Sequence, residues 1–169
     1  LWANIGVETK LETGDSVGYV DFGFPLPTDF SLDRRINSAF VNVNMYATPD
    51  FLMQASVRRD DADGLSAKDS GQGGVRYQIN ENLSWFANAG KGFKLPSFLA
   101  LGHGLIGNKN LKPELSTTRD TGVEWSANNT TINLSFFRNT YKDLIDFDNE
   151  LFTNVNRDLV DTRGVETEI

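Results

Sequence analysis

Few residues in this chain could do covalent chemistry, and His103 is the first of them. It is the only histidine among 169 residues, and the chain has no cysteine. Thiol catalysis, cysteine-ligated zinc, iron–sulfur clusters and disulfides are therefore excluded. His103 is flanked by Gly102 and Gly104, whereas a catalytic imidazole needs packed neighbours that hold it rigidly. We expect no catalytic residue, no resident metal ion, no cofactor and no enzyme activity.

Two further motifs lack the surrounding residues or elements that their usual function requires. The run from Gly102 to Gly107 matches G-x-G-x-x-G, but a dinucleotide site needs a strand that turns directly into a helix. Asp61-Ala62-Asp63-Gly64 resembles the middle of a calcium loop, yet Arg59 and Ser70 would stand at its first and last ligand positions. The net charge is −7 and the pI is 4.7, with scattered cations. This composition argues against a nucleic-acid partner.

Within the segments that must position these residues, apolar and polar residues alternate with a period of two. In 1–12 the odd positions are largely apolar and the even positions largely polar, which is typical of a strand with two unlike faces. No segment has a capped apolar stripe of helical spacing. We therefore predict an all-β, antiparallel fold with almost no helix, whose strands follow the same alternation in 1–12, 38–47, 51–58, 75–80, 83–92, 115–126, 132–136 and 153–169.

The connections predict how these strands are arranged. Tight turns are expected at 48–50, 80–82 and 127–129, and longer connections at 14–35, 61–72, 94–114 and 146–150. Strict alternation of short and long connections is typical of an outer-membrane barrel, and the predicted strands of ~9 to 13 residues suit a tilted membrane crossing. Aromatic residues near the tight turns would form an interfacial belt, or else the core of a soluble sandwich: Tyr46, Phe51, Tyr77, Trp85 and Trp125.

The segment 91–116 carries a family resemblance. Lys91-Gly92-Phe93-Lys94-Leu95-Pro96 is followed by Asn108-Lys109-Asn110-Leu111-Lys112-Pro113-Glu114. These runs resemble the barrel of TonB-dependent outer-membrane receptors, and later segments such as Asn154-Val155-Asn156 follow in the expected order. The motif residues are Gly92, Phe93, Pro96, Asn108, Asn110, Leu111, Pro113 and Glu114. The prolines also end ladder pairing, so these motifs could fold the loop as well as contact a ligand.

The resemblance implies a barrel of about 22 strands, closed by a plug. Residues 1–169 would then be a partial barrel of about eight strands that lacks the plug and the C-terminal strands. The expected location is the bacterial outer membrane, and the expected partners are its lipid, a metal-chelate ligand and the TonB complex through the plug. A self-contained eight-stranded structural or adhesive barrel, a barrel hydrolase and a soluble β-sandwich carbohydrate binder are the rival interpretations.

The implied activity is TonB-dependent uptake of an iron chelate, either a siderophore or haem, with cobalamin as the alternative. His103 lies where haem receptors of the family place a histidine that can meet iron, although a solvated loop histidine is the interpretation that the residues favour. The expected ligand-binding residues lie near the ends of the long loops: Phe30, Arg34, Arg35, Lys94, His103 and Tyr141.

Overall fold

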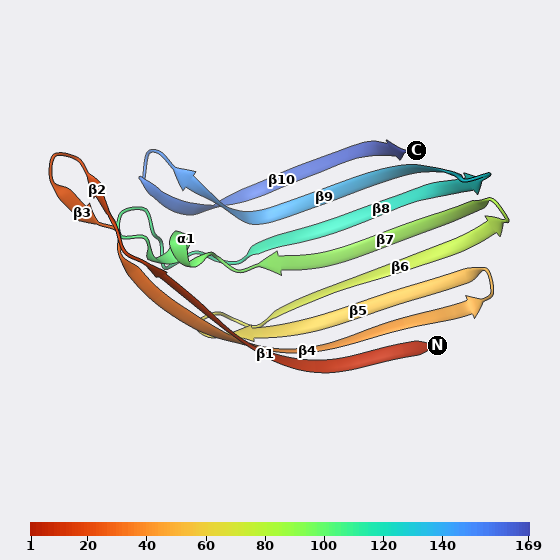
Figure 1. Ribbon diagram of the computed structural model, residues 1–169, viewed down its shortest axis with the longest axis horizontal. Helices are drawn as coiled ribbons and strands as arrows, with labels where there is room; N and C mark the ends of the chain where they lie inside the picture. The colour runs from red at the N-terminus through yellow and green to blue at the C-terminus, as the bar shows by residue number, and fades with distance from the viewer.

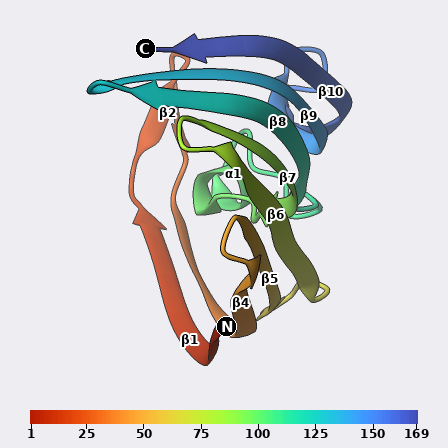
Figure 2. The same ribbon diagram turned by 90° about the vertical axis from the view of Figure 1, so that its right-hand side faces the viewer.

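The computed structural model describes residues 1–169 and consists of one curved antiparallel sheet (Figures 1 and 2). Its eight strands follow the order β1-β4-β5-β6-β7-β8-β9-β10, so β1 and β10 are edges that do not pair with each other. A closed eight-stranded barrel is therefore not what these residues form. The strands are β1 (Trp2–Ser16), β4 (Phe30–Thr48), β5 (Phe51–Ala62), β6 (Lys68–Asn80), β7 (Leu83–Lys94), β8 (Glu114–Ala127), β9 (Thr130–Asp148) and β10 (Thr153–Glu168).

The all-β prediction is confirmed, and helix is limited to α1 (Phe98–Gly102). No helix has the length and apolar character that crossing a membrane requires. A separate hairpin, β2 (Tyr19–Asp21) and β3 (Pro25–Pro27), joins β1 to β4 and projects beyond the sheet in Figure 1.

The strands are longer than predicted, from 12 to 19 residues. The three tight turns lie where expected, but two of the longer connections shrink to 63–67 and 149–152. Segments such as 30–37 and 68–74 continue the hydrogen-bonded ladder, although their side chains no longer alternate clearly between apolar and polar. Once both faces of a strand meet water, the ladder persists without the pattern that reveals it.

The two faces of the sheet differ in character. The register puts Val7, Ala39 and Arg59 on one face and Glu8, Ser38 and Asp60 on the other. The outer face is convex and exposes large apolar side chains, among them Ile5 (79% exposed), Val7 (84%) and Phe136 (54%). The inner face is concave, polar and wrapped around α1 (Figure 2). An exposed apolar face of this kind is stable where lipid covers it.

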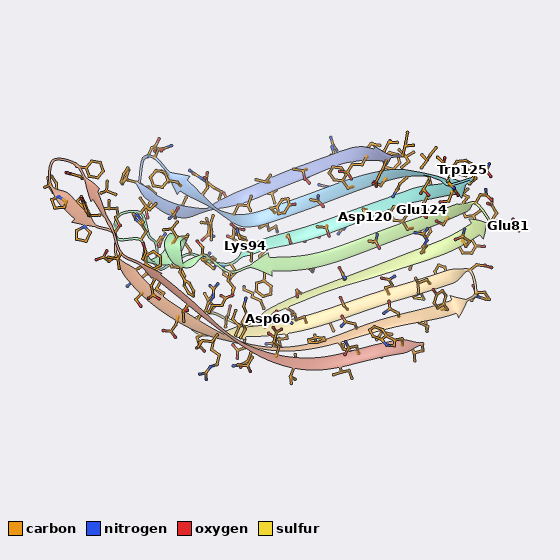
Figure 3. The ribbon with its side chains drawn as sticks, in the orientation of Figure 1. Asp60, Glu81, Lys94, Asp120, Glu124 and Trp125 are labelled. Atoms are coloured by element: carbon orange, nitrogen blue, oxygen red, sulfur yellow. The ribbon has the colours of Figure 1, made fainter.

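Aromatic residues gather on the outer face near the tight turns. Phe51 and Tyr77 pack edge to face with their centroids 6.2 Å apart, and Trp85 lies opposite Tyr77 in the next strand. Trp125 is on the same face at this end of the sheet (Figure 3). Tyr46 differs, because it lies opposite Leu52 on the inner face, where the regular alternation of β4 places it; the register shift comes after it, between Tyr46 and Thr48. The belt predicted from sequence is thus formed without Tyr46.

Three phenylalanines of the inner face lie over glycines in the neighbouring strand. The cross-strand pairs are Gly6–Phe40, Gly122–Phe86 and Gly164–Phe137. A Cβ atom built on any of the three glycines would lie under 3 Å from the opposing ring. The rings therefore occupy the space that a side chain would otherwise fill.

The two faces predict opposite responses to an added charge. Ala87 is on the outer face, about five residues from a tight turn and hence near the membrane midplane, whereas Gln72 is exposed on the inner face. Ala87→Arg should cost ~2–4 kcal/mol of barrel stability and lower the amount of assembled protein. Gln72→Arg should leave assembly unchanged. Heat-modifiable mobility of outer-membrane fractions measures both, and equal tolerance of the two variants would contradict the assignment of faces.

Candidate ligand-binding site

The connection 95–113 between β7 and β8 folds back onto the inner face at the loop end of the sheet (Figure 2). Ser97 begins α1 as its N-cap, because its Oγ accepts a hydrogen bond from the amide of Ala100 at 3.1 Å. Pro96 just before it is fully buried. This connection, which we call the docked loop (residues 95–113), contains most of the motif residues singled out in the sequence.

Arg34 of β4 anchors the first part of the docked loop. Its Nη1 donates to the carbonyl of Pro96 at 2.8 Å, and its Nε donates to Glu12 Oε2 at 2.6 Å. Its guanidinium also lies 4.8 Å from the centre of the Phe98 ring, within the range of a cation–π contact. Only 12% of its side chain is exposed. Arg34 therefore positions the loop, and its predicted contact with a ligand would have to compete with these three partners.

Two asparagines of β10 anchor the second part of the docked loop. Asn156 bonds both the amide and the carbonyl of Lys112, at 2.9 and 3.0 Å, much as a neighbouring strand would. Asn154 donates from its backbone and its side chain to the carbonyl of Ile106, at 3.0 and 2.8 Å. Asn108 returns a bond to the carbonyl of Asn154 at 2.8 Å. The loop is thus tied to the β9–β10 hairpin.

Three of the other motif residues, Leu111, Pro113 and Glu114, are also buried or hydrogen-bonded. Leu111 is 3% exposed and Pro113 is buried, whereas the side chain of Asn110 is exposed. Glu114 accepts the amide of Ile145 at 3.0 Å and the ammonium of Lys94 at 3.3 Å. Most of the motif residues therefore have a role in folding and docking the loop, and their contact with a ligand stays a prediction.

His103 immediately follows α1, and its ring is oriented by its own loop. Its Nδ1 accepts hydrogen bonds from the amides of Leu105 and Ile106, at 3.3 and 3.4 Å. In the neutral ring this arrangement assigns the proton to Nε2. A histidine that binds metal through Nε2 instead donates a hydrogen bond from Nδ1. In this conformation His103 therefore presents a hydrogen-bond donor and is not prepared to ligate iron.

The remaining predicted ligand-binding residues do not all lie on the same face of the sheet. Lys94, 74% of whose side chain is exposed, lies on the inner face near the loop end (Figure 3). Tyr141 shares that face, because it pairs with Ser116. Phe30 lies beneath α1, where it would contact a Cβ atom built on Gly102. Arg35 pairs with Leu11 on the outer face and points away from the others.

Arg58 is an inner-face residue that the ligand-binding prediction missed. It donates to Glu8 and to Asp60, each at 2.8 Å, and Asp60 also accepts a 2.6 Å bond from Ser38. The alternation in 51–58 already placed Arg58 on the polar face, but the sequence did not indicate these partners.

Between this cluster and the tight turns, the inner face forms a polar hollow of 540 Å³. Its polar lining residues are Asn42, Asn44, Gln54, Ser56, Gln72, Asn88, Thr118 and Asp120.

A wall of long antiparallel strands with an apolar outer face, a polar inner hollow and an aromatic belt defines the class of outer-membrane β-barrel proteins. Residues 2–169 match the family model described as "TonB dependent receptor-like, beta-barrel". The chain belongs to this family, whose members are transport proteins of the bacterial outer membrane and not enzymes.

The curated relatives include vitamin B12 transporters named BtuB. The protein of Photobacterium profundum is 39% identical over 89 residues, which cover 53% of this chain and 15% of that protein. The protein of Vibrio vulnificus is 28% identical over 145 residues, which cover 83% of this chain and 24% of that protein. The chain thus spans less than a quarter of the length of these relatives.

Solved structures of the family share the fold at low sequence identity. The ferric enterobactin receptor PfeA of Pseudomonas aeruginosa, in complex with enterobactin, has a TM-score of 0.82 and 20% identity, covering 98% of this chain and 30% of that one. The copper transporter OprC has a TM-score of 0.74 and 16% identity, covering 98% and 31%. These matches confirm the antiparallel barrel wall predicted from the sequence.

The asparagine anchor can be tested by removing one side chain. Asn156→Ala deletes three hydrogen bonds that hold Lys112 and the carbonyl of Asp143, so we expect the docked loop to open ~1–3 kcal/mol more easily. Amide exchange and limited proteolysis of residues 103–113 should both accelerate. Asn110→Ala, in the same motif but without a side-chain partner, should change neither. Unchanged protection in Asn156→Ala would show that the bonds do not hold the loop.

The Glu12–Arg34 anchor should depend on pH only in acid. Lys10, followed by Arg34, holds the pKa of Glu12 below its ordinary value by hydrogen bonding, against the opposing effect of burial. A lowered folded-state pKa gives stability that is present above the unfolded pKa and is lost as the pH falls through the folded one. The protection factors of the amides of residues 95, 97 and 98, which correct for the intrinsic pH dependence of exchange, should be constant from pH 7 to 5 and fall only below about pH 4. Glu12→Gln should abolish this change below about pH 4. If the change persists in the variant, another titratable group causes it.

Proposed function

We propose that this chain is part of the barrel wall of a receptor that takes up a metal chelate across the bacterial outer membrane. On this proposal residues 1–169 contribute about eight strands of a barrel of about 22, whose plug and other strands lie outside them. The family match carries the proposal. Uptake would be ligand capture at the loop end followed by plug rearrangement driven through TonB, with no covalent chemistry.

The chemistry of the loop end favours an anionic, oxygen-rich ligand. Lys94 offers a largely exposed ammonium on the inner face, and His103 offers a donor at Nε2. Charge-assisted hydrogen bonds from such groups are strongest to carboxylate, phenolate and phosphate oxygens. A ferric siderophore presents oxygens of this kind, so it is our leading ligand. The PfeA structure that contains enterobactin has the same fold, which supports a ligand of this kind.

Haem is the weaker iron source on this proposal, because His103 accepts at Nδ1 and so carries its proton on the nitrogen that would have to meet iron. Cobalamin remains the second candidate. Its support is the 39% identity to a vitamin B12 transporter over 89 residues, compared with 20% identity to PfeA.

The proposal is tested by uptake in a strain that carries only this receptor in full-length form. Under iron limitation, cells should accumulate radioiron from a ferric siderophore in a TonB-dependent manner. Lys94→Gln combined with His103→Ala should weaken binding about ten-fold, since two charged or polar donors are lost. Lys109→Gln, which changes an exposed cation of the docked loop, is the matched control and should bind as the wild type does.

Two outcomes would redirect the proposal. Accumulation of labelled cobalamin, with no siderophore uptake, would establish the second candidate. A haem absorption band that shifts in His103→Ala would show that the imidazole does ligate iron and would contradict the assignment of its proton. Uptake that persists without TonB would contradict the transport mechanism itself.

A further inference from the structure

The outer face changes abruptly from apolar to basic partway along β8, β9 and β10. Arg119 pairs with Arg138, and Arg138 pairs with Arg163, so three arginines stand in one cross-strand row on the same face. The next cross-strand row toward the tight turns is Thr121, Phe136 and Val165. We call the first set the arginine row (Arg119, Arg138 and Arg163).

The arginine row is not neutralised within the chain. Directly opposed side chains in antiparallel strands have Cβ atoms ~4.5–5.5 Å apart, and like charges there destabilise a sheet. Arg138 forms a two-pronged pair with Asp161, at 2.7 and 3.1 Å. Arg119 and Arg163 are exposed and form no ion pair. One carboxylate for three guanidinium groups leaves two positive charges without a partner.

The position of the arginine row along the membrane normal identifies the part of the lipid that it faces. Arg119 and Arg138 lie about nine residues from the tight turn at 128–129, or ~23 Å of membrane height at a strand tilt of ~40°. The apolar band of such barrels is ~25 Å tall, so the row lies at its loop-side boundary, where lipid headgroups begin. Lys91, one residue pair further toward the loops, adds a further outward cation at this level.

A second region of the outer face shows the same order of groups. Ile5, Val7, Val41 and Val57 line an apolar groove of 460 Å³, and the Arg59–Asp69 ion pair borders its loop end. An apolar surface that ends in charge at one height suits an acyl chain below a polar headgroup. The arginine row differs from this region in carrying surplus positive charge.

We propose that the arginine row binds the phosphate groups of an anionic lipid in the outer leaflet, with the lipid's acyl chains lying on the apolar face around Phe136 and Val165. Guanidinium groups bind phosphate in a two-pronged geometry, and the bound phosphates supply the negative charge that the row lacks. In a bacterial outer membrane the lipid with phosphates at this level is the lipid A part of lipopolysaccharide. The inference uses the membrane orientation of the sheet and is independent of which chelate the receptor takes up.

The test measures lipid binding by the full-length receptor in detergent. Native mass spectrometry or tryptophan fluorescence would follow titration with lipid A, with phosphatidylcholine as the neutral probe. We expect tight binding of lipid A alone, weakened about ten-fold or more in Arg119→Gln/Arg163→Gln. Arg119→Lys/Arg163→Lys keeps the charge and should retain most of the binding. Lys109→Gln/Lys112→Gln removes two cations from the docked loop and should bind as the wild type does.

Three results would overturn the proposal. These are equal lipid A binding by the glutamine double variant and the wild type, equal binding of phosphatidylcholine and lipid A by the wild type, and displacement of lipid A by millimolar inorganic phosphate. The last result would indicate a site for a free anion. A glutamine double variant that fails to assemble is replaced by the single variants Arg119→Gln and Arg163→Gln, each of which should lose part of the affinity.

Discussion

The pairing of backbone amides is the constraint on which the whole structure depends. A strand in lipid has no water to satisfy its N–H and C=O groups, so each must find a neighbouring strand. Of 106 backbone hydrogen bonds, 94 lie within the strands and the helix. With the backbone thus satisfied, side chains can be sorted onto two faces by the alternation of the pleat, and all other features of the molecule lie on one of these faces.

The docked loop is an irregular segment that the polar inner face of this sheet binds by hydrogen bonds. It is held from both sides of the curved wall, by Arg34 of β4 and by Asn154 and Asn156 of β10. Its two ends belong to the neighbouring strands β7 and β8, yet it contacts β4 and β10, which are six positions apart in the sheet order. The binding chemistry that we propose for Lys94 and His103 is thereby set on a surface of fixed shape.

The sequence was sufficient for the strands and insufficient for the loop contacts. The alternation in 1–12 predicts both the strand and its faces, because period two is a local property. It could not reveal that 68–74 remains strand, since residues beyond the membrane obey no alternation. Nor could it show that Arg34 is occupied or that Nδ1 of His103 accepts hydrogen bonds, because both depend on segments brought together only by folding. Tyr46 was misplaced although the alternation in 38–47 already puts it with the even positions, which form the inner face.

The glycine–phenylalanine pairs of the inner face have a consequence for how the sequence can vary. Each ring fills the position of its partner's missing side chain, so alanine at Gly6 or Gly164 has no room until the opposing phenylalanine becomes smaller, whereas at Gly122 the carbonyl of Leu134 also blocks a Cβ atom. Gly6 and Phe40, and likewise Gly164 and Phe137, should therefore change together during divergence.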